Sequence, residues 1–416
     1  MQLRAEAFLL TNRKCQGGRR ARGNTGEEMD TRNRQSLIYL DNAATSFPKP
    51  ERVIEKMNEL MIYHGGNAGR GSHILALEAA EQVYECRELL SGFFDAEGPE
   101  RVCFAMNTTE ALNVVIKGIL RRGDHVLISD MEHNAVYRPI YKLWREGVIE
   151  YDVFPTLVGA LRTPNMICAH IAKLMRRNTK MLICTGASNI CSMTMPLREI
   201  GEFCRKNGII FVVDGAQCAG HIPISMREMK IDALCIPGHK GLLGPQGCGA
   251  LILGKGIAPD TLLEGGNGIN SLLGDMGEDM PERYEAGTLP TPAIAGLCEG
   301  VKIVKELGVE AIARHEAILF DRAAELLGNM RGVKIYAPEY KGSVMLFGID
   351  GVGAEELASY LSQCGICTRG GFHCCALGHR TLGTEKTGAV RASFGVYNSS
   401  RDVEMLADAV NNIRKM

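Results

Sequence analysis

The sequence predicts an α/β protein with a large domain on a seven-stranded, mostly parallel sheet and a smaller C-terminal α/β domain. Its 416 residues exceed what one hydrophobic core normally serves. Short apolar runs alternate with helix-length segments from residue 37 onward, and a second such series follows a Gly-rich stretch over 265–287. Alternating strands and helices are typical of a parallel sheet covered on both faces.

The large domain is expected over residues 36–300. Helix-length segments such as 109–120 and 197–206 separate most of its apolar runs, which implies crossover connections between parallel strands. The last two runs are closer together, so an antiparallel edge is expected there. The predicted strands are 102–105, 126–129, 151–154, 181–185, 209–214, 233–236 and 250–253.

The smaller domain is expected over residues 301–416, where the alternation of helix and strand patterns resumes. We expect the first residues of the large domain to be able to pack on it. Residues 1–35 are rich in arginine and show no amphipathic period, which predicts a disordered tail. Met29 offers an alternative start, so we leave open whether residues 1–28 belong to the native protein. The expected elements after the tail and the large sheet are helices 292–306, 309–329 and 354–363 and strands 344–347 and 391–394.

Composition excludes several function classes. Lys plus Arg number 47 and Asp plus Glu 48, so no excess charge indicates a nucleic acid partner. No apolar run reaches the roughly 18 residues of a membrane span, and the N-terminus lacks a signal peptide, so we expect no membrane association and a cytoplasmic location. Most of the 15 cysteines lie in apolar runs, where a thiol behaves as a small hydrophobe.

Two charged residues follow neighbouring predicted strands. Asp214 ends the strand 209–214, and Lys240 follows the strand 233–236 in a glycine-flanked turn. Because ligands collect at the carboxyl ends of parallel strands, both side chains are expected in one crevice. This is the pair that pyridoxal phosphate requires: the carboxylate keeps the pyridine nitrogen protonated and the amine forms a Schiff base. A structural ion pair explains the two residues equally well.

Other strand ends carry residues with two interpretations. Thr108 and Thr109 open a helix whose N-terminus suits a phosphate, although an ordinary helix cap explains them too. His133 follows another strand, where a histidine is more often structural. Asn189 follows a third and is compatible with turn chemistry.

Six ordered motifs resemble the class V aminotransferase superfamily of fold-type I pyridoxal-phosphate enzymes. Within it, the segment from Arg369 to Cys374 and the segment from Val390 to Ser393 resemble the cysteine desulfurase branch, specifically the Suf-type group. The six motifs are Leu40 to Thr45, Thr108 to Glu110, Glu132-His133, Ser188-Asn189, Asp214 to Gln217 with Gly238 to Lys240, and Arg283 to Thr288.

The resemblance implies how the cofactor would be held. Lys240 would carry it as a Schiff base, His133 would stack on its ring, and Asp214 would pair with its nitrogen. Gln217 and Asn189 would lie near its phenolic oxygen and the substrate. The phosphate would be held by Thr108, Thr109 and His239, with Ser271 of the neighbouring subunit of a homodimer as a further candidate.

The resemblance also implies a reaction. Arg391 would clamp the substrate carboxylate, with Asn67 and Arg369 as further candidates. L-cysteine would displace Lys240, which would then remove the Cα proton. The Cys374 thiolate would attack the substrate sulfur, which leaves a persulfide and L-alanine. His373 and Arg369 are expected to favour the thiolate.

The persulfide sulfur would pass to an acceptor protein, for example in iron–sulfur cluster assembly. L-selenocysteine is a second possible substrate. The alternatives are a selenocysteine lyase or another class V lyase or aminotransferase with Cys374 incidental, and a non-enzymatic scaffold or regulator that binds pyridoxal phosphate.

The cysteines near the C-terminus also raise the alternative of a zinc site. Cys364 and Cys367 precede the adjacent pair Cys374-Cys375, which lacks the two separated knuckles of a four-ligand module, so we expect no metal. Cys375 stands where the family commonly has alanine. It is either a small apolar replacement or a thiol that exchanges with the persulfide. Pro237 replaces a Ser or Thr before Gly-His-Lys, which removes a hydroxyl from the expected phosphate site.

Overall fold

The structure is a computed structural model that describes residues 37–69, 71–156, 163–269 and 271–413. The tail predicted over residues 1–35 lies outside this part of the chain. Within it, no helix is both long and apolar enough to cross a bilayer.

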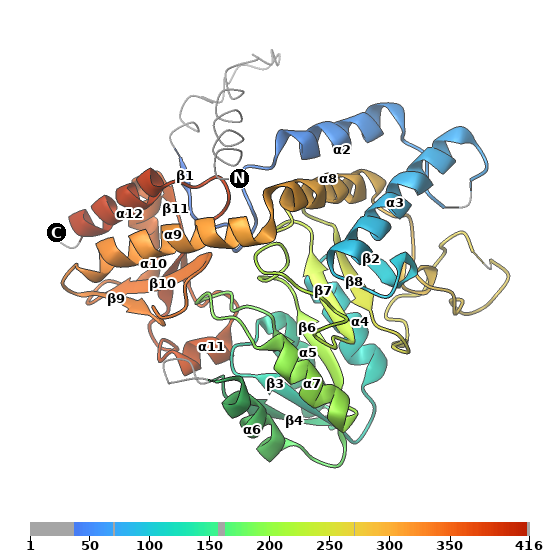
Figure 1. Cartoon of the computed structure of the whole chain (residues 1–416), viewed down its shortest axis with the longest axis horizontal. Coiled ribbons are helices and arrows are strands. Elements are labelled where there is room, and N and C mark those ends of the chain that lie inside the picture. Colours follow the sequence, from blue (N-terminus) through green and yellow to red (C-terminus); the bar gives the residue numbers. More distant parts are fainter. Residues whose placement is uncertain (1–36, 70, 157–162, 270, 414–416) are drawn as a thin grey trace.

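The large sheet has the seven predicted strands, in the spatial order β2-β8-β7-β6-β5-β3-β4 (Figure 1). Strands β3 to β7 pair in parallel, whereas β8 is antiparallel to both of its neighbours. The antiparallel pairing expected for the last two strands is confirmed, but β8 is not the edge strand, because β2 pairs with its other side. The short connection after β7 turns the chain back beside it, and β2 then covers the free side of β8. The strands are β2 (Val102–Ala105), β3 (Asp124–Ser129), β4 (Ile149–Phe154), β5 (Thr179–Thr185), β6 (Ile210–Asp214), β7 (Ala233–Pro237) and β8 (Gly249–Leu253).

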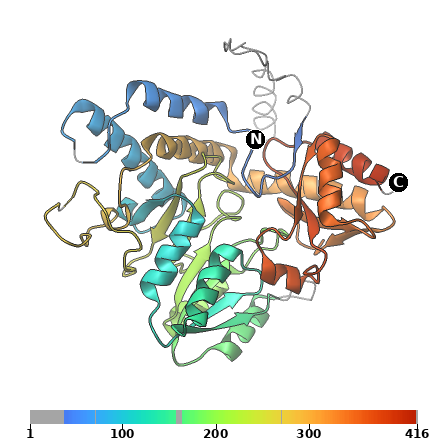
Figure 2. The ribbon, with the colours of Figure 1, turned by 180° about the vertical axis from the view of Figure 1, so that it is seen from behind.

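Helices cover both faces of this sheet, as the apolar runs of its inner strands require. Met181 and Ile183 of β5 pack in the cluster of α4 (Thr108–Ile119) and α5 (Asn134–Arg145). Leu182 and Cys184 point to the other face, into the cluster formed with α3, α6, α7 and α8. Figure 2 shows the first face, with the cyan and green helices α4 and α5 over the strands. The helices of the other face are α3 (Ile74–Phe93), α6 (Pro164–Leu174), α7 (Leu197–Asn207) and α8 (Thr291–Leu307).

The C-terminal part forms a second sheet of order β12-β13-β10-β9, antiparallel throughout. Its helices bury a separate apolar cluster against it. The apolar pattern did not reveal β9 and β12, which are short and carry charged or glycine residues. The elements are α9 (Val309–Gly328), β9 (Val333–Tyr336), β10 (Val344–Ile349), α10 (Ala354–Gln363), β12 (Arg369–Gly371), α11 (Ala376–Thr381), β13 (Ala389–Ser393) and α12 (Ser400–Ile413).

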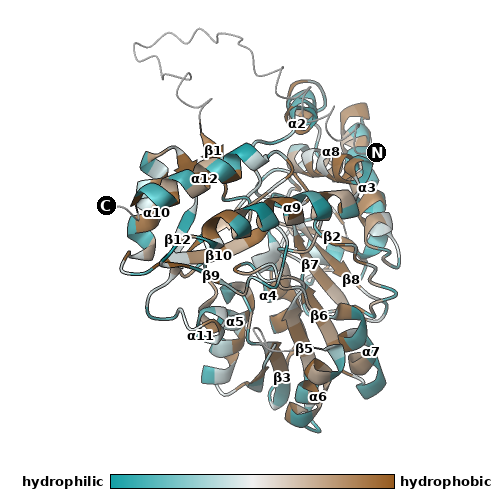
Figure 3. Cartoon of the chain, turned by 60° about the vertical axis from the view of Figure 1, so that its left-hand side comes forward, coloured by the Kyte–Doolittle hydropathy of each residue, from teal (hydrophilic) through white to brown (hydrophobic). Residues whose placement is uncertain are grey.

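The start of the described chain joins this second unit. Strand β1 (Ile38–Tyr39) pairs in parallel with β11 (Ile366–Cys367), and Asp41 bridges to Ser393. Helix α2 (Glu51–Tyr63) then crosses to pack on α8. The domain boundary expected at residue 300 falls inside α8, which continues to residue 307 on the large unit. The boundary therefore stays a prediction. Figure 3 shows the apolar strands inside, with polar helix faces such as those of α7 and α9 outside. The remaining described elements are the 3-10 helices η2 (Pro99–Arg101) and η3 (Glu282–Tyr284).

Candidate active site

The ends of the parallel strands bring most of the predicted site residues to one edge of the sheet. Asp214 ends β6, Lys240 follows β7, and Asn189 follows β5. His133 follows β3 as the N-cap of α5, and Thr108 begins α4. Neighbouring parallel strands end at the same edge, so these side chains converge there.

Lys240 and Asp214 are a buried amine and a buried carboxyl group. Burial lowers the pKa of Lys240 to about 8, although the charge of Asp214 opposes this shift. Asp214 is 1% exposed, and its Oδ1 accepts a 2.9 Å hydrogen bond from the Ala216 amide. Burial raises its pKa, and the Lys240 charge works against that. The site therefore favours a cationic partner for the carboxylate and an amine that deprotonates easily.

The N-terminal segment fixes the turn of Lys240. The carbonyl oxygen of His239 accepts hydrogen bonds from Thr45 Oγ1 (3.0 Å), Ser46 Oγ (3.2 Å) and Lys49 Nζ (2.8 Å). Sequence reasoning did not assign these three residues a role, although the motif from Leu40 to Thr45 was a signal. The Ser46 amide is a fourth donor to the same carbonyl. Together the four hydrogen bonds tie the turn of Lys240 to the N-terminal segment.

Two of the polar atoms expected to hold the phosphate lack a hydrogen-bond partner among the described residues. They are Thr108 Oγ1 and His239 Nδ1, both buried. Thr108 is the first residue of α4, whose N-terminus is capped by Asn107, and Thr109 beside it is exposed. A buried polar atom without a partner is costly, and an anion at a helix N-terminus would satisfy it. The donors present here fit a phosphate group, although Pro237 contributes no hydroxyl to them.

His133 presents a neutral imidazole. Its Nδ1 accepts a 3.0 Å hydrogen bond from the Ala135 amide, which places the proton on Nε2. Burial, followed by the charge of Lys240, lowers its pKa to about 4. A neutral, oriented ring is suited to stacking on an aromatic ligand.

Arg391 links three segments of the chain. Its Nη2 donates to Asp41 Oδ1 at 2.7 Å, and its Nη1 donates to the Asn189 carbonyl at 3.1 Å. Among the described residues its buried Nε has no partner, which leaves a donor for a ligand. Gln217 Nε2 donates to the Ala43 carbonyl at 2.9 Å, so it also contacts the N-terminal segment. Sequence reasoning missed Asp41, which stood in a quoted motif but had no assigned role.

Cys374 is exposed and lies next to the start of α5. Its carbonyl oxygen accepts a 2.7 Å hydrogen bond from the Asn134 amide, the residue after His133. Burial lowers the pKa of His373 to about 3, so a neutral imidazole precedes Cys374. The role expected for His373 and Arg369 in favouring the thiolate stays a prediction. Arg369 is exposed, and its charge contributes to the lowered pKa of Lys240.

Cys375 points away from Cys374 into the core. It is fully buried, and its Sγ lies 3.6 Å from the carbonyl oxygens of Met131 and Glu132. Burial raises the pKa of this thiol. The geometry favours a small apolar replacement over an exchanging thiol. In the described ranges, no three His, Cys, Asp or Glu side chains are arranged to hold a metal ion.

Asn67 and Ser271 lie in exposed loops. A β-carbon placed on Gly69 would lie 3.9 Å from the Asn267 carbonyl, so these two loops are neighbours. Both loops project on the same side of the molecule, at the right of Figure 1. The roles predicted for the two residues stay predictions.

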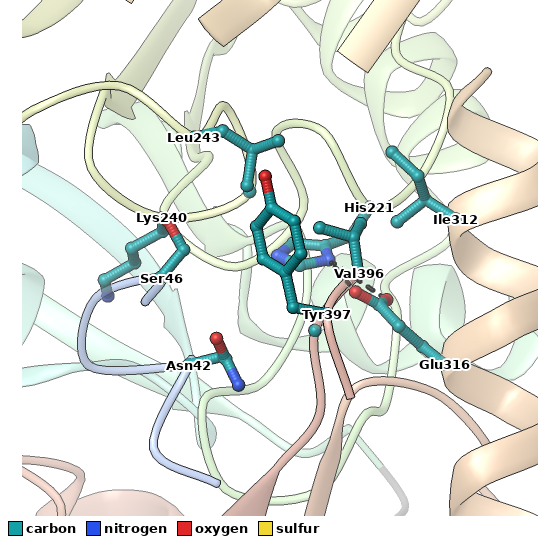
Figure 4. Close-up of a pocket in the computed structure, with 11 residues that line it drawn as sticks. Asn42, Ser46, His221, Lys240, Leu243, Ile312, Glu316, Val396 and Tyr397 are labelled. Carbon is teal, nitrogen blue, oxygen red and sulfur yellow. Dashed lines mark hydrogen bonds and ion pairs between the residues drawn. The ribbon is translucent and has the colours of Figure 1, made fainter. Parts of the chain in front are cut away.

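A small pocket lies behind the lysine turn (Figure 4). His221 and Glu316 both line it and contact each other, with His221 Nδ1 3.0 and 3.1 Å from the two carboxylate oxygens. The Tyr397 hydroxyl, buried and without a partner among the described residues, points toward the same space. Sequence reasoning missed these three residues because they stand in ordinary helix and turn patterns.

Known proteins resemble this chain over nearly its whole length. A cysteine desulfurase of Yersinia pseudotuberculosis is 32% identical over 397 residues, which cover 92% of this chain and 95% of that protein. The apo structure of a cysteine desulfurase from Thermococcus onnurineus NA1 superposes with a TM-score of 0.80 at 28% identity. That superposition covers 94% of this chain and 99% of the other.

The family match agrees with the fold and with the residues at the sheet edge. The profile of the family described as Aminotransferase class-V matches residues 38–406, which include both sheets and the segments of Lys240 and Cys374. The chain therefore belongs to the class-V aminotransferase family.

Proposed function

We propose that this chain is a pyridoxal-phosphate-dependent cysteine desulfurase that converts L-cysteine to L-alanine and retains the sulfur as a persulfide on Cys374. The observation that carries the proposal is the convergence of Lys240 and Cys374 on His133. Burial and then the charge of Lys240 lower the pKa of His133, and the amide of the next residue, Asn134, donates to the Cys374 carbonyl. The names of the relatives support the same reaction.

The residues at the sheet edge fit the cofactor. Thr108 and His239 would hold its phosphate, with Thr109 at the same helix start, and Asp214 would pair with its ring nitrogen. His133 would stack on the ring, and Gln217 and Asn189 would lie beside it. Bound pyridoxal phosphate supplies an aldehyde for the Lys240 amine and a protonated ring that accepts electrons.

Lys240 acts as the base of the reaction. Its pKa of about 8 lets a fraction of the amine be neutral at physiological pH, and a neutral amine can take the proton from the substrate Cα. Arg391, already oriented by Asp41 and Asn189, offers its free Nε to the substrate carboxylate.

Cys374 receives the sulfur. Its thiolate attacks the substrate sulfur, so an S–S bond forms and the Cβ–S bond breaks. The electron pair of the broken bond stays with Cβ, which takes a proton and becomes the methyl group of alanine. The substrate carbon is reduced while the two sulfurs are oxidised to a persulfide, so no external oxidant is needed. The exposed position of Cys374 leaves this sulfur accessible to an acceptor.

A homodimer with Ser271 of the neighbouring subunit at the site, a sulfur-acceptor protein, a cytoplasmic location and membership in the Suf-type group remain parts of this proposal. L-selenocysteine is a substrate that the same thiolate attack would serve.

The variant Cys374→Ala tests the proposal. It should lose alanine formation from L-cysteine and keep the absorbance of bound pyridoxal phosphate, because Lys240 and the phosphate donors are intact. Cys364→Ala is the matched control, since Cys364 is also an exposed thiol of the C-terminal part. Full alanine formation by Cys374→Ala would refute the thiolate mechanism, and a wild-type chain that does not take up the cofactor would refute the whole proposal.

A further inference from the structure

The backbone that carries Cys374 takes a conformation that L side chains rarely adopt. His373 has φ +50° and Cys374 has φ +54°. The Cys375 amide donates to the Phe372 carbonyl at 2.9 Å, so these two are the central residues of a closed four-residue turn. Glycine or asparagine normally occupies such positions. Two residues with β-carbons persist there only if surrounding contacts hold them.

Two of these contacts bind the peptide groups of the turn. Asn189 Nδ2 donates to the His373 carbonyl at 2.8 Å, and the Asn134 amide donates to the Cys374 carbonyl at 2.7 Å. Both donors belong to the active-site edge of the large sheet. They fix the turn from the side on which the substrate would bind.

The other side of the turn is held through the His373 ring. Its Nε2 lies 3.0 Å from the Arg369 carbonyl, which can only accept, so Nε2 carries the proton. Its Nδ1 lies 3.2 Å from His379 Nε2, and the two rings stack with centroids 5.4 Å apart. His379 Nδ1 lies 2.7 Å from Thr384 Oγ1.

The direction of each hydrogen bond follows from the first one. Burial lowers the pKa of both histidines, so both rings are neutral. His373 Nδ1 must then accept from His379 Nε2, and His379 Nδ1 must accept from the Thr384 hydroxyl. His379 and Thr384 are fully buried, so water does not compete for these bonds.

We infer that His379 and Thr384 are positioning residues for Cys374, because the chain of hydrogen bonds from Thr384 through His379 to His373 holds the left-handed turn that presents the thiol. The inference rests on the proposed role of Cys374 as the nucleophile. The chain transfers no proton, since it ends on the Arg369 carbonyl. Its effect is to fix where the sulfur lies.

Variants at these two positions test the inference in the full-length, cofactor-loaded protein. His379→Phe keeps the ring and removes both hydrogen bonds, and Thr384→Val removes the terminal donor. A misplaced nucleophile should lower kcat for alanine formation by about 10- to 100-fold, with little change in KM or in cofactor absorbance. Thr384→Ser restores the hydroxyl and should restore most of kcat.

Two further measurements do not depend on turnover. Amide hydrogen exchange of residues 369–376 should be faster in His379→Phe and Thr384→Val, because the turn is less constrained. The pH dependence of Cys374 alkylation by iodoacetamide should keep its midpoint, since neutral rings supply no charge to the thiol. A midpoint that rises in these variants would show an electrostatic role and overturn the inference.

The matched control is His125, a buried histidine of β3 whose Nδ1 lies 2.8 Å from Thr179 Oγ1. His125→Phe, or Thr179→Val if that variant does not fold, should leave kcat and the exchange of residues 369–376 unchanged. An equal loss of kcat in the control, or unchanged kcat in both test variants, would overturn the inference. If the wild-type protein forms no alanine but the test variants still exchange faster over residues 369–376, the proposed function is refuted. The role of His379 and Thr384 in holding the turn is not.

Discussion

The ion pair of His221 and Glu316 joins the two units of the chain at the lysine turn. Helix α9 supplies Glu316, which is 2% exposed, and the His221 side chain is 15% exposed. A β-carbon placed on Gly241, the residue after Lys240, would lie 2.7 Å from the His221 ring. The variant Glu316→Gln keeps the shape of this contact and removes its charge.

The expected loss of stability depends on pH. Burial disfavours the protonated imidazole, but the Glu316 carboxylate outweighs this effect and raises the pKa of His221. A group with a raised pKa stabilises the folded state fully below its ordinary pKa and loses that effect as pH rises through the raised value. A hydrogen bond to a charged group contributes about 1.5–3 kcal/mol and a neutral one about 0.5–1.5. Glu316→Gln should therefore lower the free energy of unfolding by about 1–2 kcal/mol at about pH 6, and by less at about pH 9.

Urea unfolding of the wild type and the variant at both pH values measures this difference. The charge of Lys240 opposes the raised pKa of His221, and this opposing charge is present in both proteins. Glu310→Gln, an exposed change in the first turn of the same helix, is the control. It removes a helix-dipole interaction worth about 0.3–1 kcal/mol, and its loss should be equal at both pH values. An equal loss at both pH values, or none at about pH 6, would refute the charged state assigned to His221.

Three further predictions concern other buried groups. Arg87→Met should lower the free energy of unfolding by about 3–5 kcal/mol, measured by denaturant unfolding, because it leaves the buried Glu285 carboxylate without the Nη1 partner at 2.8 Å. Arg391→Lys should raise KM for L-cysteine about 10-fold in steady-state kinetics, since an ammonium cannot bind Asp41 and a carboxylate in the same planar geometry. Cys375→Ala should leave the rate of persulfide formation on Cys374 unchanged by mass spectrometry, because this thiol is buried with a raised pKa, and a large loss would show that it exchanges sulfur.

The seven strands of the large sheet and the pair Asp214 and Lys240 could be predicted from the sequence. The inner strands are buried on both faces and are therefore visible as apolar runs, whereas the edge strand β4 also includes Glu150 and Asp152. A charged residue at or soon after the end of such a run indicates either a site at the sheet edge or a structural ion pair. The position of β8 could not be predicted, because apolar runs do not tell which strand pairs with which.

The contacts that orient the site residues were decided only by the tertiary structure. Asp41 and Arg391 are 350 residues apart, and His221 and Glu316 are 95 apart, so no local pattern connects them. The sequence showed His373 beside Cys374, but burial and the bond to the Arg369 carbonyl determine that its ring is neutral. Residue types and local periodicity determine which groups are available, whereas charge state and orientation depend on the desolvation and the partners that packing creates.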